Sequence, residues 1–162
     1  MQKKESELDQ LKKNFAVLQK KYSLPNFKQL NEDFEIEKLS GKETDMLLRE
    51  IRKLIVDKVL AYLRFLELLM NPTSAPMFFL AIVKTLSVED KKLVENLYKS
   101  MASVEFNALD LDNRYSEKTE AEFIKNTYSS WQETKTEFSE LAGQLKATWN
   151  KKSTKKERGY FG

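Results

Sequence analysis

Three charged residues interrupt otherwise apolar helical faces, and they are the first candidates for buried polar chemistry: Arg52, Lys58 and Glu105. Burying an unpaired charge costs several kcal/mol, so a charge on an internal face needs a partner. If these faces are internal, we expect Glu105 to form a structural ion pair with Arg52 or Lys58. Two alternatives remain. In one, the basic side chains extend along a helix edge to water while Glu105 reaches solvent; in the other, the group binds a ligand.

A second set of candidates lies in residues 151–162, where cations cluster ahead of two aromatic residues. The set comprises Lys151, Lys152, Lys155, Lys156, Arg158, Tyr160 and Phe161. Clustered cations can neutralise phosphates or an acidic protein surface, and adjacent aromatics can anchor in an apolar pocket of a partner. The two aromatics can equally fold back onto their own domain. Because this segment lacks apolar residues before Tyr160, we expect a mobile tail that binds a protein or nucleic acid.

The absence of two residue types excludes most catalytic chemistry. The 162 residues include no histidine and no cysteine, so imidazole bases, thiolate nucleophiles and the usual zinc and haem ligands are missing. Serine mechanisms that need an imidazole base are excluded with them. The four glycines are isolated, and no glycine-rich phosphate loop is present. We therefore expect no catalytic residue, no metal and no cofactor.

Carboxylates are the remaining groups suited to metal chemistry, because Mg²⁺ prefers oxygen ligands. Two sets of acidic residues are available for such a site. They are Glu105, Asp110 and Asp112 in one segment, and Glu133, Glu137 and Glu140 in another. The second set lies on the side of its expected helix away from the apolar residues, which is typical of a solvated face. A magnesium-dependent helical hydrolase is therefore only the third-ranked function.

The net charge of +3 is unevenly distributed along the chain. Residues 1–30 hold seven lysines against three acids, and residues 151–162 hold five basic residues against one acid. The segment between these ends is net acidic. This pattern indicates a neutral to acidic body with cationic ends, and it differs from a nucleic-acid-binding domain whose folded face is basic.

The low content of turn-forming residues predicts a few long helices, because only four glycines and three prolines occur. A first helix over about residues 3–22 carries a narrow apolar seam with heptad spacing: Leu8, Leu11, Phe15, Leu18 and Tyr22. Two heptads are too few to be stable alone, so this helix must pack on its own chain or on another copy. Pro25 opens a short second segment. Ser40 and Glu43 fit a capping box before a central helix over residues 43–70.

Three further helices complete the expected architecture. We expect a short buried helix from residue 77 to about 86, a helix over residues 88–111 and a last helix over residues 117–150. The last helix has a continuous heptad seam made of Ile124, Tyr128, Trp131, Lys135, Phe138, Ala142, Leu145 and Trp149. Lys135 either sets the register of this seam or marks a gap where the helix overhangs the bundle.

The sequence as a whole predicts an all-α, single-domain helical bundle over residues 1–150, with a long central helix and long heptad-patterned helices at both ends. The absence of cysteine and of an apolar leader favours a cytoplasmic location, and the longest apolar run is too short to span a membrane. We expect a non-catalytic scaffold or adaptor that binds a protein partner, or a second copy through the heptad seams. The alternative is a nucleic-acid-associated protein that binds phosphates through its basic ends.

Overall fold

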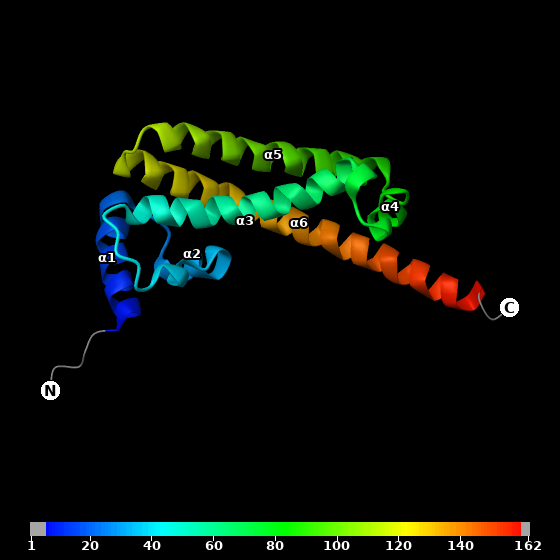
Figure 1. Ribbon diagram of the computed structural model, residues 1–162, viewed down its shortest axis with the longest axis horizontal. Helices are drawn as coiled ribbons and strands as arrows, with labels where there is room; N and C mark the ends of the chain where they lie inside the picture. The colour runs from blue at the N-terminus through cyan, green and yellow to red at the C-terminus, as the bar shows by residue number, and fades with distance from the viewer. Residues whose placement is uncertain (1–5, 160–162) are drawn as a thin grey trace. The chain divides into compact units, whose positions relative to one another are not determined.

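The computed structural model describes the backbone of residues 6–159 and the side chains of residues 6–151. Within that part of the chain the structure is all-α, with helices and no strands, which confirms the predicted fold class (Figure 1). The helices are α1 (Glu7–Tyr22), α2 (Phe27–Phe34), α3 (Leu47–Met70), α4 (Met77–Val83), α5 (Val88–Asn113) and α6 (Glu117–Gly159), with short 3-10 turns at Ile36–Leu39 and Pro72–Ser74.

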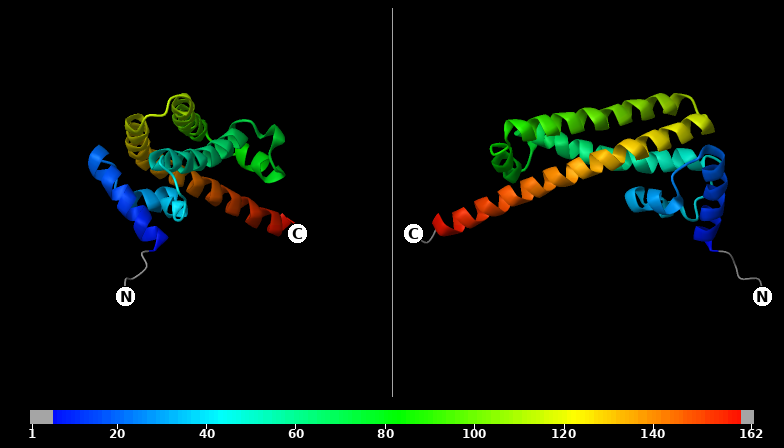
Figure 2. Two further views of the ribbon diagram at one scale, coloured as in Figure 1. Left: turned by 60° about the vertical axis from the view of Figure 1, so that its left-hand side comes forward. Right: turned by 180° about the vertical axis from the view of Figure 1, so that it is seen from behind.

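The chain divides into two compact units, to each of which α3, α5 and α6 contribute. The first unit comprises residues 1–60 and 103–131, and the second comprises residues 61–102 and 132–162. In the first unit, the end of α5 lies beside the starts of α3 and α6 (Figures 1 and 2). None of the helices in the described ranges is both long enough and apolar enough to cross a bilayer.

Helix α1 packs within the first unit through the predicted seam. Leu11 and Phe15 are buried, and Phe15 meets Phe27 of α2 edge to face with ring centroids 5.8 Å apart. Two of the five predicted seam residues are thus buried within one chain, and the other three, Leu8, Leu18 and Tyr22, are half-buried. Ser6 begins the helix by accepting a hydrogen bond from the Asp9 backbone N–H at 3.1 Å, and Ser23 ends it in a left-handed conformation.

The start of α3 differs from the prediction. Ser40 and Glu43 do not cap it; Ser40 follows the 3-10 turn, and the helix begins at Leu47. Gly41 explains the difference, because its φ of +76° turns the chain away from a helical path. A Cβ added at Gly41 would lie 2.6 Å from the Glu7 carboxylate of α1, but that flexible side chain can move aside, so the positive φ is the reason for glycine at this position.

Helix α3 has the wide apolar arc that its sequence predicted. In the first unit Leu48, Ile51, Ile55 and Val59 are buried, and in the second unit Leu63, Leu66 and Leu69 are buried. The polar side is exposed at Lys53, Asp57, Arg64 and Glu67. Asn71 and Pro72 follow its last residue, as expected for a helix stopped by proline.

Helix α4 occupies its predicted place but is only partly buried. Phe79 and Ile82 face inward, whereas Met77 is 80% exposed and Phe78 is 45% exposed. The prediction of a short buried helix is therefore wrong for one side of it. Helix α5 begins as predicted, because Ser87 and Asp90 cap each other's backbone N–H groups, each at 3.0 Å.

Helix α6 has heptad spacing in a different phase from the predicted one. Its inward positions follow the 4-3 spacing of Glu120, Ile124, Thr127, Trp131, Thr134, Phe138, Leu141 and Leu145, of which Phe138 is half-buried and the rest are buried. Every second predicted position is thus correct, and the intervening ones are wrong; Lys135 and Ala142 are exposed. A threonine is small enough to fit between packed helices, whereas the large ring of Tyr128 stays half-buried beside the seam.

Helix α6 also extends further than expected. Its backbone remains helical to Gly159 instead of ending near Asn150. Lysine, glutamate and arginine favour helix, and no proline or internal glycine interrupts residues 151–158. After Leu145, however, no described side chain of this helix is buried. The predicted mobility of residues 151–162 stays a prediction.

The phase of α6 can be tested by truncating Leu141, which is fully buried in the observed phase and would have been off the predicted seam. We expect Leu141→Ala to lower the free energy of unfolding by about 2–5 kcal/mol, because it removes buried methyl groups and leaves a cavity. Leu109→Ala is the matched control; Leu109 is 52% exposed, so its truncation should change stability by no more than about 0.5 kcal/mol. Equal effects in urea denaturation would contradict the observed phase.

Candidate functional site

The buried charge of Arg52 is neutralised inside the first unit. Its Nε donates to Glu120 Oε2 at 2.7 Å, and its Nη2 donates to Asp112 Oδ1 at 2.7 Å. Nη1 donates to the carbonyl oxygen of Ala108 at 3.4 Å. Arg52 is 2% exposed and Glu120 is fully buried, so the charge-assisted hydrogen bond between α3 and α6 is shielded from water. The bond to α5 lies at the edge of the site, because the side chain of Asp112 is 50% exposed.

Two opposing effects act on the pKa of Arg52. Burial acts to lower the pKa of Arg52, but the hydrogen bonds that it donates to Glu120 and Asp112 outweigh this effect, and the pKa lies above its ordinary value. Glu120 Oε1 has no hydrogen-bond partner in the described structure. One carboxylate oxygen therefore carries the contact with Arg52, and the arrangement is that of a structural ion pair.

The partners of Arg52 are not those that the sequence suggested. Arg52 is buried, as the ion-pair hypothesis required, but it pairs with Glu120 and Asp112 and not with Glu105. Glu105 is half-buried, and it lines a cavity of about 220 Å³ together with Arg52 and Asp112. Lys58 is also half-buried; its charge contributes, after the hydrogen bond from Lys38, to the lowered pKa of Glu35.

Glu120 was missed because the predicted apolar seam of the last helix began at Ile124. Ser116 does sit at the start of α6, where its Oγ accepts from the Thr119 N–H at 3.5 Å. Glu120, however, lies four residues before Ile124 on the inward face. If the apolar face of α6 is extended by one helical turn towards the start of the helix, Glu120 lies inside, opposite Arg52 of α3.

A second polar group joins the end of α1 to the start of α6. Glu117 accepts hydrogen bonds from Lys21 Nζ and from the Tyr22 hydroxyl, both at 2.7 Å. The hydrogen bond from Lys21, followed by that from Tyr22, lowers the pKa of Glu117. Arg49 lies over the ring of Tyr115 nearby, 6.0 Å from the ring centroid. The two hydrogen bonds to Glu117 connect the end of α1 to the start of α6.

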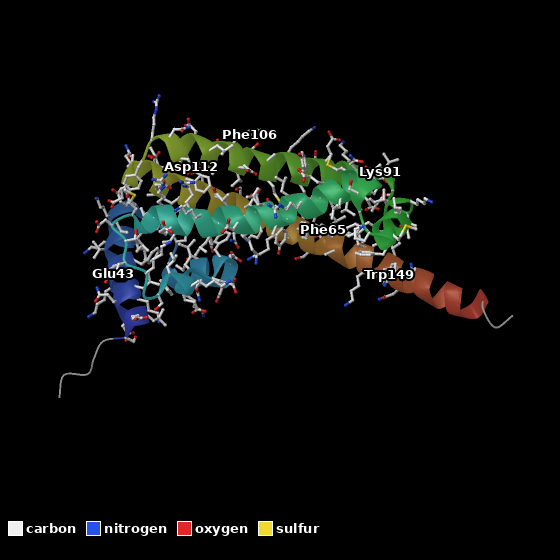
Figure 3. The ribbon with its side chains drawn as sticks, in the orientation of Figure 1. Glu43, Phe65, Lys91, Phe106, Asp112 and Trp149 are labelled. Atoms are coloured by element: carbon white, nitrogen blue, oxygen red, sulfur yellow. The ribbon has the colours of Figure 1, made fainter. Side chains whose placement is uncertain are left out.

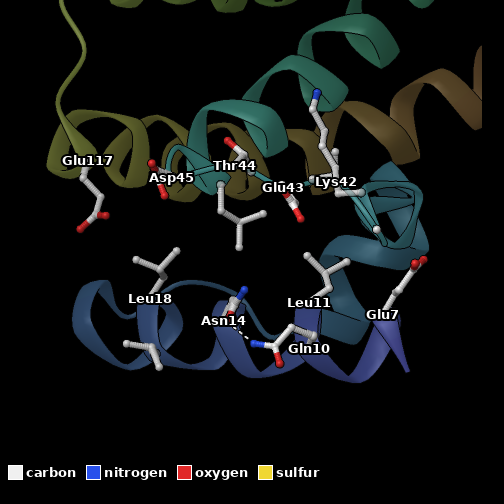
Figure 4. Close-up of a pocket in the computed structure, with 14 residues that line it drawn as sticks. Glu7, Gln10, Leu11, Asn14, Leu18, Lys42, Glu43, Thr44, Asp45 and Glu117 are labelled. Atoms are coloured by element: carbon white, nitrogen blue, oxygen red, sulfur yellow. Dashed lines mark hydrogen bonds between the residues drawn. The ribbon is translucent and has the colours of Figure 1, made fainter. Parts of the chain in front are cut away.

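An acid-rimmed cavity of about 580 Å³ lies between α1 and the loop of residues 41–45 (Figure 4). Leu11 and Leu18 point into it from α1, and Glu43 and Asp45 lie on the opposite side. In the ranges that the structure describes, no three acidic side chains are grouped so as to hold a metal ion, including the two sets considered from sequence. The arrangement has no feature that requires a ligand.

An apolar groove in the second unit is bounded by α3, α4 and α6; Figure 3 labels Phe65 and Trp149, two of its residues. Its volume of about 420 Å³ lies in the range of ligand pockets and exceeds the ~150 Å³ of a cavity that holds benzene. The lining residues are Phe65, Leu69, Phe78, Phe79, Ile82, Leu145, Lys146 and Trp149. Lys146 is the only charged side chain among them.

The walls of this groove are aromatic and partly open to water. Phe78 and Trp149 stand edge to face with centroids 6.0 Å apart, and they are 45% and 44% exposed. The ring centroid of Phe79 lies 4.5 Å from that of Phe78 and 5.6 Å from that of Phe65, so these three rings pack together in the groove. The sequence had assigned Trp149 to helix packing. In the sequence, α4 is apolar on every side, and this was the available sign that one side of the helix would lack a packing partner.

No family model, curated protein or solved structure matches this chain. Its function is therefore argued from the groove and from the tail. Lys151 is exposed, and Lys152, Lys155, Lys156 and Arg158 stand on the helical backbone of α6 with side chains outside the described part. Tyr160 and Phe161 lie outside the described residues, so their anchoring role and nucleic-acid binding by the tail stay predictions.

The ion pair of Arg52 is tested by a matched pair of carboxylate replacements. Glu120→Gln removes a charge that is buried against Arg52, so we expect the free energy of unfolding to fall by about 3 kcal/mol. Glu105→Gln removes the partner suggested by the sequence and should change stability by no more than about 0.5 kcal/mol. Urea denaturation at neutral pH measures both. A larger loss for Glu105→Gln would contradict the assigned pairing.

The contact of Glu117 predicts a pH dependence of stability. Its pKa is lower in the folded protein than the ordinary 4.5, so its contribution is present above that value and is lost as the pH falls through the folded pKa. The stability difference between the wild type and Glu117→Gln should be constant near neutral pH and should shrink below pH 4.5. Glu137→Gln, at an exposed position, is the control. Parallel wild-type and Glu117→Gln curves down to about pH 3 would contradict the lowered pKa.

Proposed function

We propose that the protein is a non-catalytic adaptor that binds a partner protein through the aromatic groove of its second unit. The observation that carries the proposal is the pair of half-exposed rings, Phe78 and Trp149, beside a concave apolar floor. Soluble proteins seldom leave such side chains grouped at the surface without a binding role. Aromatic residues are also the residues that most often dominate the free energy of protein association.

The charged groups support a non-catalytic role. Arg52, Glu120 and Asp112 bind one another, and Glu117 is bound by Lys21 and Tyr22. Each of these contacts connects elements of the first unit and supplies a structural reason for the residues involved. The groove itself offers shape and apolar area, with one lysine as its polar group. Recognition of a side chain or a helix needs no more than this.

Selection of displayed random peptides on the intact protein tests the proposal. We expect enriched peptides to carry bulky apolar anchors and to bind Phe78→Asp and Trp149→Asp about thirtyfold more weakly, which corresponds to a hot-spot loss of about 2 kcal/mol. The control is Phe106→Asp on α5, because Phe106 is 71% exposed and lies outside the groove. Fluorescence anisotropy measures affinity, and circular dichroism checks that each variant folds.

Two results would overturn the adaptor function. One is a failure to enrich any peptide that binds the wild type. The other is equal binding of the enriched peptides to the wild type and to both groove variants.

A further inference from the structure

We propose that the partner of the groove is an acidic amphipathic helix, which seats apolar side chains between Phe78 and Trp149 and directs its carboxylates to the lysines along α6. This inference rests on the proposed adaptor function and adds the chemistry of the occupant. The groove is bounded by three helices, and no described part of the chain offers a strand edge to an extended peptide. A further helix can pack its ridges of side chains against such walls.

Helix α6 continues beyond the part of it that lines the groove. Among its described side chains the last buried one is Leu145, yet its backbone stays helical to Gly159. Trp149 also lines the groove, one turn beyond Leu145, and it is 44% exposed. An incoming helix would cover Trp149 and continue along this face of α6.

The face of α6 that continues from the groove carries lysines. At about 100° per residue, positions 152 and 156 fall within about 60° of the arc that holds Leu145 and Trp149. Lysine occupies both positions, and Lys146 lines the groove itself. Positions 151 and 158 are also basic, but they lie on the opposite side of the helix. The charge that adjoins the groove is therefore positive.

This charge selects among possible occupants. The chain's own tail is rich in lysine and arginine, so the tail of a second copy would meet like charges along α6. A helix with glutamate or aspartate beside its apolar anchors meets opposite charges at the same place. Apolar burial supplies most of the affinity, and the lysines supply the preference for an acidic partner.

Two peptide libraries test the inference. Both contain amphipathic helices with randomised apolar anchors at i, i+3, i+4 and i+7; the polar positions are glutamate in one library and lysine in the other. We expect the wild type to enrich the acidic library and to bind its best peptides about tenfold more tightly than their lysine twins, as several surface charge pairs would give. This preference should decline as salt is raised.

Paired charge reversals locate the preference on the helix. Lys152→Glu with Lys156→Glu should weaken the acidic peptides about tenfold and favour the lysine twins. Lys151→Glu with Arg158→Glu changes the net charge by the same amount on the other side of α6, and it should leave most of the preference in place. All four positions lie in the last turns of the helix, and circular dichroism verifies that helix content is kept.

Several outcomes would overturn the proposal that an acidic helix occupies the groove. Equal binding of acidic and lysine peptides, with both lost in Phe78→Asp, would leave the adaptor function standing and remove the charge preference. A dimer in sedimentation analysis that Phe78→Asp converts to monomer would show that a second copy covers the groove. Failure of every peptide, with co-sedimentation on vesicles of phosphatidylserine, would assign the surface to a membrane and would overturn the adaptor function as well.

Discussion

The buried guanidinium of Arg52 is the constraint on which the first unit depends. Arginine keeps its charge at any physiological pH, so a site that leaves it 2% exposed must supply carboxylates. Glu120 of α6 and Asp112 of α5 do so, and the Ala108 carbonyl accepts a third N–H. Such a pair adds little stability over well-packed apolar residues. It makes other packing registers of these helix segments costly, because each would leave a charge buried without a partner.

The places where prediction from sequence succeeded share a local cause. Ser87 with Asp90 and Asn71 with Pro72 define helix ends through contacts within a few residues, which a sequence shows directly. The wide apolar arc of α3 is similarly local, since it follows from helical periodicity. The start of that helix was mispredicted because Gly41 takes a left-handed conformation where α1 approaches, and this approach is a tertiary contact.

The phase of α6 and the partner of Arg52 were missed for one reason. Both depend on which of two adjacent residues faces inward, and size favoured Tyr128 over Thr127 when only the sequence was considered. Once Thr127 is inward, Glu120 falls on the same face seven residues earlier, and a buried carboxylate follows. The sequence therefore contained both halves of the ion pair. The observed phase buries Thr127 and Thr134 between packed helices, and helical periodicity alone does not show this packing.

The aromatic groove results from a mismatch between α4 and the space available to bury it. A short helix that is apolar on every side needs neighbours all round, and the second unit gives Phe79 and Ile82 such neighbours but leaves Met77 and Phe78 exposed. At about 25 cal/mol per Å² of apolar area, covering this surface is favourable for any apolar partner and so does not discriminate among partners. Discrimination must come from charge, and the helical continuation of α6 places lysine positions 152 and 156 on the face that adjoins the groove. A mobile tail would spread the same charges over all directions, so the proposed preference for an acidic partner depends on the helical backbone.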